Sequence, residues 1–386
     1  MRMPPLPRAL PPLLFLWAAV PRALGGRNPP ADIPAFEIDL DKPPRLRWQH
    51  VGRHFRPWIK DHLKVAQLDV HGGPWSDEEF DDLITIAGFP EELSEEIWGI
   101  VESVDLPEIT HRNLLKQQVL YELGFTQGFA CAGIVAAKAD GTVVHGRNFD
   151  LSAEARDGNA LTIEVVFVKG GRAIARGPSW FGFVGMHTGV RLHEGWSIEA
   201  NTRYGGVDFG IWYDTSKGWS ENYRAAWREA GTKAIQAGGK FQQLEGRRVL
   251  LEMETFADAV AALAMTPWAA PQYWILSGAG QSAGAVITAD RTGMSHSEYE
   301  IQMLNAAAGE WFIVQTNDDH WKKPYDSRRK SAAHMMKKVK DSGRGFDEAI
   351  VMRTLRSQPV CVPGTLFTWV CNPTTEEEQF DMGECL

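Results

Sequence analysis

Apolar residues recur at helical spacing in the part of the chain between residues 26 and 130. Ser76 and Glu79 have the spacing of a capping box and precede an apolar stretch, and Leu93 and Ile97 belong to a second helical run. This pattern predicts that residues 26–130 are mainly helical.

After residue 129 the pattern changes to alternating or continuous apolar runs separated by turn residues, which predicts a sheet. The expected strands lie at 132–138, 142–149, 161–169, 172–177, 196–200, 272–278, 283–290 and 310–317. Two further helices are expected near 220–237 and 256–263, and the acidic run 376–378 is expected to be a solvated tail.

Asp140-Gly141 lies between two of these apolar runs, which predicts a hairpin with a two-residue turn of type I′. If Ala139 pairs with Thr142, the same register places Cys131 opposite Asp150. Opposed residues have Cβ atoms about 4.5–5.5 Å apart. We therefore expect the carboxylate within reach of the thiol and of the nitrogen of residue 131.

Arg147 lies in the same strand as Asp150, and strict alternation sends their side chains to opposite faces. If both serve one site, a bulge near Asn148 must re-aim one of them. The alternative is a buried thiol on a hairpin that ends in a salt bridge, with no catalytic role.

Composition and charge narrow the choice of function. The chain has 386 residues and a net charge of -9, from 40 Lys and Arg against 49 Asp and Glu. An acidic balance supplies no basic field for phosphates, so nucleic acid is not expected as a partner. The 11 His have no metal-ligand spacing, and the phosphate-loop, G-x-S-x-G and H-E-x-x-H signatures are absent. We expect no metal and no cofactor.

Residues 1–25 have the pattern of a secretory signal peptide, with Arg2 and Arg8 before the apolar stretch 10–20. Pro11 and Pro12 interrupt that stretch and leave a signal anchor or an intracellular start as alternatives. We expect a mature protein that is soluble in the secretory lumen. The sequence contains no Asn-x-Ser/Thr acceptor, so it does not support an N-linked lysosomal address.

Three cysteines besides Cys131 follow near the C-terminus, at 361, 371 and 385. An oxidising lumen permits one disulfide and one free thiol, or three free thiols. The spacing does not choose between these arrangements.

From about residue 34 to residue 359, the chain resembles the family of N-acylethanolamine acid amidase and acid ceramidase. These are N-terminal nucleophile hydrolases related to bile salt hydrolases. The matching segments are RLRW at 45–48, C-x-G-I-V-A from Cys131, HGRNFD at 145–150, ILSGAGQSAGAVITADR at 275–291, VQTNDDHWKKP at 314–324 and SRRKSA at 327–332. The resemblance implies an α+β fold of four αββα layers, in which two antiparallel sheets are flanked by helices.

The family is made as an inactive precursor that cleaves itself, and the resemblance places the cut between Ala130 and Cys131. It implies a helical alpha subunit, 26–130, that stays bound to a catalytic beta subunit, 131–386. Before the cut the nitrogen of Cys131 is an amide and cannot act as a base. Afterwards it is an α-amine with an ordinary pKa near 7.7–8.0, beside a thiol near 8.5. One residue then supplies both nucleophile and base.

The resemblance also assigns roles. Cys131 is the nucleophile and forms a thioester that water hydrolyses. Asp150 orients the new α-amine and assists self-cleavage, and Arg147 stabilises charge at the thiol and the carbonyl. Asn317 is expected to donate to the oxyanion, and Arg328 is expected to be a further site arginine, with Arg329 as its alternative.

The triplet Asn201-Thr202-Arg203 departs from the family, which has Asn-Glu-Arg or Asp-Glu-Arg at this place. Asn201 keeps a side-chain amide that can donate to an oxyanion. Thr202 supplies no carboxylate, which leaves the efficiency and the pH dependence of maturation open. Asp318 also stands where the family has tyrosine.

The resemblance implies hydrolysis of a fatty acyl amide in a lysosome or secretory lumen. An N-acylethanolamine is the first expectation, because the helical part lacks the extra cysteine of acid ceramidase and His320-Trp321 resembles the acylethanolamine enzyme. Ceramide, a bile-salt or penicillin-type amide, and an inactive lipid-binding relative are the alternatives. A lipid amide substrate implies a membrane surface as partner. The aromatic segments 180–183 and 211–213 are candidate lining.

Overall fold

The structure is a computed structural model that describes residues 33–62, 76–119, 122, 130–150, 161–203, 221–291, 293–294, 301–321, 326–341 and 346–386. All of them belong to one unit, Ile33–Leu386. The signal segment 1–25 and the aromatic segment 211–213 lie outside the described residues. None of the helices among the described residues has the length and apolarity needed to span a bilayer.

The part before Cys131 is mainly helical, as predicted. Its helices are α1 (Pro44–Arg47), α2 (Gln49–Asp61), α4 (Asp77–Ala87), α5 (Glu91–Val104) and α6 (His111–Gln118). The predicted capping box at the start of α4 is confirmed, since Ser76 Oγ accepts from Glu79 N and the Glu79 carboxylate accepts from Ser76 N. The part before Cys131 also contains a strand that the pattern missed, β1 (Ala35–Asp39), which pairs parallel with a strand of the later part.

The described strands form two sheets. The larger has the order β1-β4-β5-β6-β7-β8-β9-β10, with β11 also on β9, and the smaller has the order β12-β2-β3-β13-β14. The strands of the larger sheet are β4 (Thr162–Lys169), β5 (Arg172–Trp180), β6 (Thr188–Arg191), β7 (Trp196–Thr202), β8 (Gln272–Gly278), β9 (Gly284–Asp290), β10 (Gly293–Met294) and β11 (Ile301–Met303). Those of the smaller are β2 (Ala130–Ala137), β3 (Val143–Asp150), β12 (Phe312–Gln315), β13 (Thr365–Asn372) and β14 (Glu377–Asp381). Every predicted strand is present, and β13 and β14 are among those that the pattern missed.

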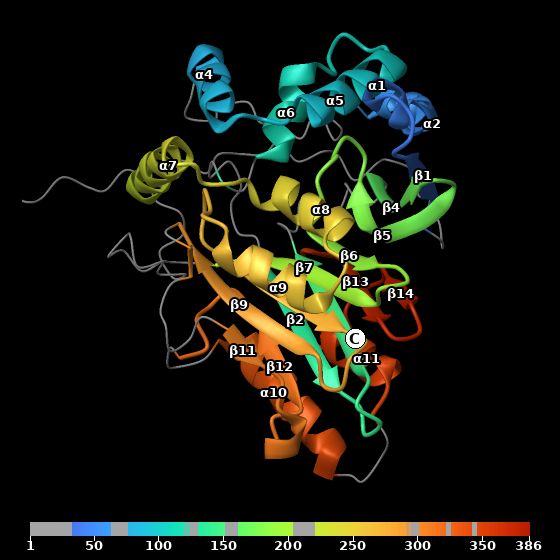
Figure 1. Cartoon of the computed structure of the whole chain (residues 1–386), viewed down its shortest axis with the longest axis vertical. Helices are drawn as coiled ribbons and strands as arrows, with labels where there is room; N and C mark the ends of the chain where they lie inside the picture. The colour runs from blue at the N-terminus through green and yellow to red at the C-terminus, as the bar shows by residue number, and fades with distance from the viewer. Residues whose placement is uncertain are drawn as a thin grey trace, which may run out of the picture. The chain divides into compact units, whose positions relative to one another are not determined.

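The two sheets pack face to face, and helices cover their outer faces (Figure 1), which confirms the four αββα layers. These helices are α8 (Gln242–Glu252) and α9 (Phe256–Met265) on the larger sheet, and α10 (Ser327–Asp341) and α11 (Glu348–Arg356) on the smaller. The helix predicted near 220–237 is α7 (Glu221–Gln236).

Residues of β2 alternate between two layers of this sandwich. Ile134 packs in a cluster with Met336 of α10 and Leu355 of α11. Its neighbour Val135 packs in a different cluster with Tyr273 of the larger sheet. Side chains of the β2–β3 hairpin therefore reach either the space between the sheets or the α10–α11 layer, according to their place in the alternation.

The predicted hairpin register was wrong by one residue. Ala130, and not Cys131, pairs with Asp150, so that Cys131 lies opposite Phe149. The turn has three residues, because Lys138 pairs with Thr142 through an N–O distance of 2.7 Å. Gly141 takes the left-handed position with φ of 87°, which belongs to a three-residue hairpin loop and not to a type I′ turn.

The acidic run 376–378 is not a solvated tail. The side chain of Glu378 on β14 is 2% exposed and lies 2.5 Å from Arg176. Its carboxylate also accepts from the Trp369 indole at 2.6 Å. Burial raises the pKa of Glu378 to about 7. The last strand is thus an integral part of the smaller sheet.

The sequence left the pairing of the C-terminal cysteines open. The structure contains a disulfide between Cys361 and Cys385. Cys371 is free and buried on β13. The bond joins the segment after α11 to the end of the chain.

A buried ion cluster ties the helical part to the rest of the chain. Glu96 on α5 is fully buried and accepts from Arg47 at 2.9 Å and from the Trp48 indole at 2.8 Å. Arg247 on α8 donates to both oxygens of the same carboxylate, at 2.5 and 2.8 Å. With the β1–β4 pairing, this cluster gives the segments before and after residue 130 a shared core.

The cluster predicts a difference between two adjacent arginines. Replacing Arg247 by Ala leaves part of a buried carboxylate without its partner and should lower the free energy of unfolding by about 3 kcal/mol. Arg248→Ala, which removes only half-exposed pairs within α8, should cost below about 1 kcal/mol. Denaturant unfolding of the two variants measures the difference, and equal losses would contradict a stabilising role for the buried cluster.

Candidate active site

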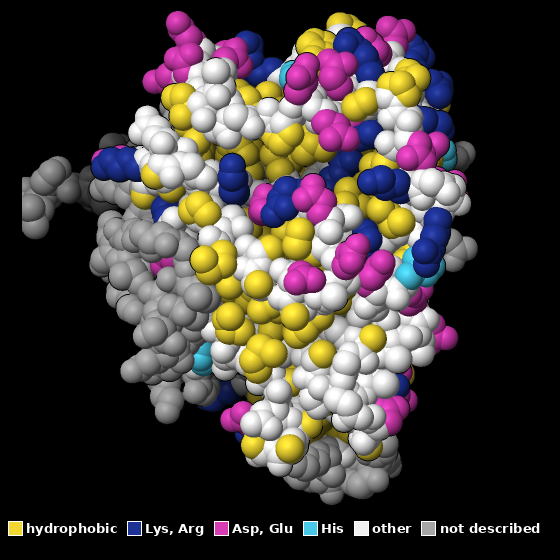
Figure 2. Space-filling view, in the orientation of Figure 1, with side chains coloured by type: hydrophobic (Ala, Val, Ile, Leu, Met, Phe, Trp, Pro, Cys, Tyr) yellow, Lys and Arg dark blue, Asp and Glu magenta, His cyan; other side chains and the backbone are white. Residues whose placement is uncertain are grey.

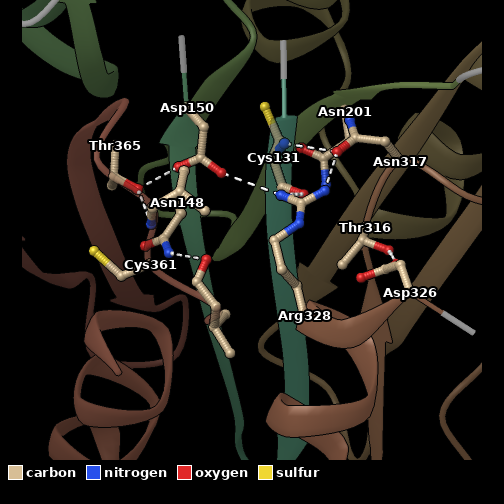
Figure 3. A network of polar contacts seen from close by, with 12 residues as sticks. Cys131, Asn148, Asp150, Asn201, Thr316, Asn317, Asp326, Arg328, Cys361 and Thr365 are labelled. Atoms are coloured by element: carbon tan, nitrogen blue, oxygen red, sulfur yellow. Dashed lines mark hydrogen bonds and ion pairs between the residues drawn. The ribbon is translucent and has the colours of Figure 1, made fainter. Parts of the chain in front are cut away.

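Cys131 is the second residue of β2 and is 2% exposed. Its backbone nitrogen donates to Asn317 Oδ1 at 2.8 Å, and its carbonyl oxygen accepts from Arg328 Nη1 at 3.1 Å. Its sulfur accepts from Arg147 Nη2 at 3.2 Å. Three different side chains thus contact the nitrogen, the carbonyl and the sulfur of one residue, and Figure 3 shows the first two contacts.

Arg147 reaches the sulfur from the space between the sheets. Its Nη1 donates to Thr188 Oγ1 at 2.6 Å, and its guanidinium lies 5.0 Å from the centre of the Phe149 ring. The bulge expected near Asn148 does not lie in β3, which pairs with β2 without a break in register. A break in register does occur on the other side of β3, in β13 between Thr365 and Phe367. Strict alternation already puts Arg147 on the same face as Cys131.

Asp150 faces the other layer. Its carboxylate accepts from Thr365 Oγ1 at 2.6 Å and forms an ion pair with Arg328 at 3.2 Å (Figure 3). The expectation that it faces Cys131 directly was wrong, for the reason of register given above. Asp150 lies instead across from Ala130, beside the peptide bond at which the resemblance places the cut.

Asn317 and Arg328 meet at the nitrogen of Cys131. Asn317 Oδ1 accepts from Arg328 Nη2 at 2.7 Å as well as from Cys131 N. Asn317 Nδ2 donates to the carbonyl of Thr202 at 2.8 Å. In this geometry Asn317 presents an acceptor to Cys131, so its role as an oxyanion donor stays a prediction. Of the two candidate arginines, Arg328 faces the site, whereas Arg329 donates to the Asp318 carbonyl.

Asn201, near the end of β7, is buried beside this group (Figure 3). Its Nδ2 donates to the carbonyl of Gln315 at 3.3 Å, and its Oδ1 has no hydrogen-bond partner among the described residues. Its oxyanion role therefore also stays a prediction. Thr202 adds its carbonyl to the site as the acceptor for Asn317.

Burial raises the pKa of two groups at the site, the Cys131 thiol and the Asp150 carboxyl. It raises the pKa of the Cys131 thiol to about 11, and the nearby Arg147 opposes this shift. Burial also raises the pKa of Asp150 to about 6, against the opposing charge of Arg328. The thiol is therefore neutral at physiological pH and needs a base to react.

The sulfur borders a small cavity of about 40 Å³. Its aromatic wall contains Phe149, Trp180, Phe183 and His187, which stack in sequence with centroid distances between 4.2 and 5.6 Å. The other lining residues are Gln117, Ala200, Thr202, Gln242 and Gln243. The volume suits a few waters and is far below the roughly 300 Å³ of a typical ligand pocket. A bound acyl chain therefore needs room beyond this cavity.

The predicted aromatic lining 180–183 is partly in place. Trp180 and Phe183 border the cavity, whereas Phe181 packs against Phe55 in the main core. Within the described residues, no cluster of three His, Cys, Asp or Glu side chains is suited to a metal ion.

Sequence reasoning missed the partners that hold the site residues, chiefly Thr188, Thr365 and Glu199. Glu199 carried a usable signal, because it is a charge inside the apolar strand 196–200. The two ring nitrogens of His145 on β3 contact Ser197 Oγ and Glu199 Oε2.

The raised pKa of Asp150 predicts a pH-dependent stability difference in a Cys131→Ala background, where the chain stays whole. A folded-state pKa of about 6 exceeds the ordinary 3.8, so the stabilisation from Asp150 is complete below about pH 4 and is lost as the pH rises through about 6. Asp150→Asn does not titrate. The melting temperature of Asp150→Asn relative to its parent should therefore rise between about pH 4 and 7, and a constant difference would contradict the assignment.

Comparison with known proteins places these residues in a family. A family model described as the beta subunit of N-acylethanolamine-hydrolyzing acid amidase matches residues 31–67. The chain is 31% identical over 353 residues to the N-acylethanolamine-hydrolyzing acid amidase of Caenorhabditis elegans, covering 88% of each. It is 27% identical over 375 residues to the acid ceramidase of Macaca fascicularis, covering 91% of this chain and 86% of that protein.

A solved structure of the same family also resembles this chain. The ortholog of N-acylethanolamine-hydrolyzing acid amidase from Caenorhabditis elegans matches with a TM-score of 0.52 and 29% identity, over 63% of this chain and 93% of that one. The sequence relatives and the shared fold agree. The chain belongs to the family of N-acylethanolamine acid amidase and acid ceramidase, a family of amide hydrolases.

Proposed function

We propose that this protein is a self-cleaving cysteine amidase that hydrolyses fatty acid amides, with N-acylethanolamines as its preferred substrates. The observation that carries the proposal is the environment of Cys131, whose nitrogen, carbonyl and sulfur contact Asn317, Arg328 and Arg147 respectively. Such a set suits a residue that must first be released as a chain end and then act as a nucleophile.

Self-cleavage begins with attack of the Cys131 sulfur on the carbonyl carbon of Ala130. A C–S bond forms, the C–N bond to Cys131 breaks, and the thiol proton ends on the released nitrogen. Water then hydrolyses the thioester and restores the thiol. Asp150, across from Ala130 and with a pKa of about 6, can exchange protons beside this bond in an acidic compartment.

Amide hydrolysis repeats the same chemistry on the substrate. The free α-amine takes the thiol proton as the sulfur attacks the acyl carbon, and it passes that proton to the departing amine. Arg147, 3.2 Å from the sulfur, stabilises the thiolate as it forms. Asn317 Oδ1 already accepts from the nitrogen of Cys131, so it is suited to orient the α-amine after the cut.

The two pieces remain associated in this proposal, because the contacts across the cut survive it. The pairing of β1 with β4 and the contacts of Glu96 with Arg247 do not involve the peptide bond at residue 130. A beta-subunit family model that matches residues 31–67 agrees with a two-subunit enzyme.

We place the enzyme in a lysosome or another part of the secretory lumen, at a membrane surface. The signal-like segment 1–25 supports the route, and the Cys361–Cys385 disulfide suits an oxidising lumen. Figure 2 shows hydrophobic side chains gathered on the face that carries α8 and α9. Met265, the last residue of α9, is 78% exposed. An apolar face of this kind suits peripheral contact with the membrane that holds a lipid amide.

Intact mass of the protein purified from secreting cells tests the cut. After incubation at acidic pH, the wild type should give two pieces, the first beginning near residue 26 and the second at Cys131. Cys131→Ala should stay whole and release no fatty acid. A wild type that hydrolyses amides with the Ala130–Cys131 bond intact would overturn the proposed mechanism.

Release of fatty acid from matched substrates tests the specificity. With equal acyl chains presented in vesicles, hydrolysis of the N-acylethanolamine should exceed that of the ceramide and of a polar penicillin-type amide by about tenfold or more in kcat/KM. Faster cleavage of ceramide would favour the activity named in the acid ceramidase relatives. Equal, negligible rates with a correctly cut chain would favour an inactive lipid-binding relative.

A further inference from the structure

A buried carboxylate lies behind the arginine that contacts the catalytic sulfur. Glu199 on β7 is fully buried between the sheets, and its Oε1 is 3.8 Å from Arg147 Nε. Neither of these two atoms has a hydrogen-bond partner among the described residues. The Arg147 guanidinium thus contacts the Cys131 sulfur through Nη2 and has the Glu199 carboxylate beside its Nε.

The second oxygen of the Glu199 carboxylate contacts His145. Glu199 Oε2 is 3.0 Å from His145 Nε2, and His145 Nδ1 is 2.8 Å from Ser197 Oγ. Ser197 Oγ continues to Ser277 Oγ at 2.6 Å. This row of polar side chains comes from strands of both sheets, so the position of Glu199 is fixed by the packing of one sheet on the other.

Gly133 makes the room that Glu199 occupies. Gly133 pairs with Arg147 across the β2–β3 ladder. A Cβ at Gly133 would lie 2.5 Å from Glu199 Oε2 and 2.7 Å from Glu199 Oε1, closer than any normal contact. The Cys-Ala-Gly sequence at 131–133, near the start of β2, therefore provides the proposed nucleophile and, two residues later, the space for the Glu199 carboxylate beside Arg147.

The charges around Arg147 indicate that Glu199 is its ion-pair partner. A buried guanidinium without a partner is costly, and Glu199 is the carboxylate that the described residues bring within 4.0 Å of Arg147. Thr202, at the place where the family has glutamate, brings no charge. The carboxylate beside the site arginine in this chain is therefore that of Glu199, at a different position on β7.

We propose that Glu199 is a positioning residue for the reaction at Cys131, and that it acts by orienting the Arg147 guanidinium so that Nη2 stays on the sulfur. His145 holds the Glu199 carboxylate in turn, and Gly133 admits it. The inference rests on the proposed function in one respect, which is that Cys131 is the nucleophile.

Glu199→Gln keeps the shape of the side chain and removes its charge. Because a misplacement of about 1 Å can cost about 100-fold in rate, we expect kcat to fall by about 10- to 100-fold while KM changes by less than about twofold. The rate of self-cleavage should fall with kcat. Glu378→Gln is the matched control, since it also replaces a buried glutamate paired with an arginine but lies on β14, away from Cys131. It should lose stability without losing kcat.

A double-mutant cycle separates positioning from a general loss of structure. If Glu199 acts through Arg147, then Glu199→Gln should cost less than about twofold in kcat or self-cleavage when Arg147 is already Met. Gly133→Ala, which displaces the carboxylate, should reproduce the loss seen in Glu199→Gln. If Glu199→Gln fails to fold, Glu199→Asp serves in the same cycle, with a partial loss that disappears in the Arg147→Met background.

Two results would overturn the inference. One is full kcat in a folded Glu199 variant, and the other is the same fractional loss with and without Arg147. Cys131→Ala, measured in the same assays, separates this failure from that of the proposed function. An active Cys131→Ala would refute the nucleophile itself, whereas an inactive one beside a fully active Glu199→Gln would refute only the role of Glu199.

Discussion

The period-two alternation of a pair of antiparallel strands is the constraint on which this site depends. It sends Arg147 into the space between the sheets, where it meets the sulfur of Cys131, and sends Asp150 to the helical layer, where it meets Arg328. The Cys131 sulfur, the proposed nucleophile, and the peptide bond before it therefore lie beside two separate charge pairs. A slip of one residue in this register would exchange the two faces and dismantle both pairs.

The pKa of the Cys131 thiol depends on this placement of Arg147 and Asp150 on opposite faces of β3. The sulfur lies in an apolar, buried place in which burial raises the pKa of the thiol to about 11. The charge of Arg147 opposes that shift, and the Glu199 carboxylate lies 3.8 Å from Arg147 Nε. The thiol is thus kept neutral until a base is available, and in the proposed mechanism that base is the nitrogen of Cys131 after the cut. On this proposal the precursor is inactive and the cut enzyme is active because the same residue supplies the nucleophile and the base.

The sequence predicted the secondary structure and the layers well, but it did not predict the strand register or the side-chain contacts of the site. Strongly periodic segments gave the strands and the helical part, and the family resemblance gave the layers. The predicted hairpin register was wrong because Asp140-Gly141 fits both a two-residue and a three-residue loop. Only the packing of the two sheets decides between these loops. Glu199 and Thr365 were missed because their importance lies in contacts between distant strands. The choice between Arg328 and Arg329 likewise required the position of α10 relative to β2.

The central claim is that Cys131 becomes a free chain end and carries the acyl group. The most direct measurement is acid quenching of the enzyme during turnover of a slow N-acylethanolamine, followed by mass analysis of its peptides. The account predicts a fatty acyl group on the sulfur of a peptide that begins at Cys131 with an unblocked amine. An acyl group on another residue, or turnover with Cys131 still joined to Ala130, would contradict it.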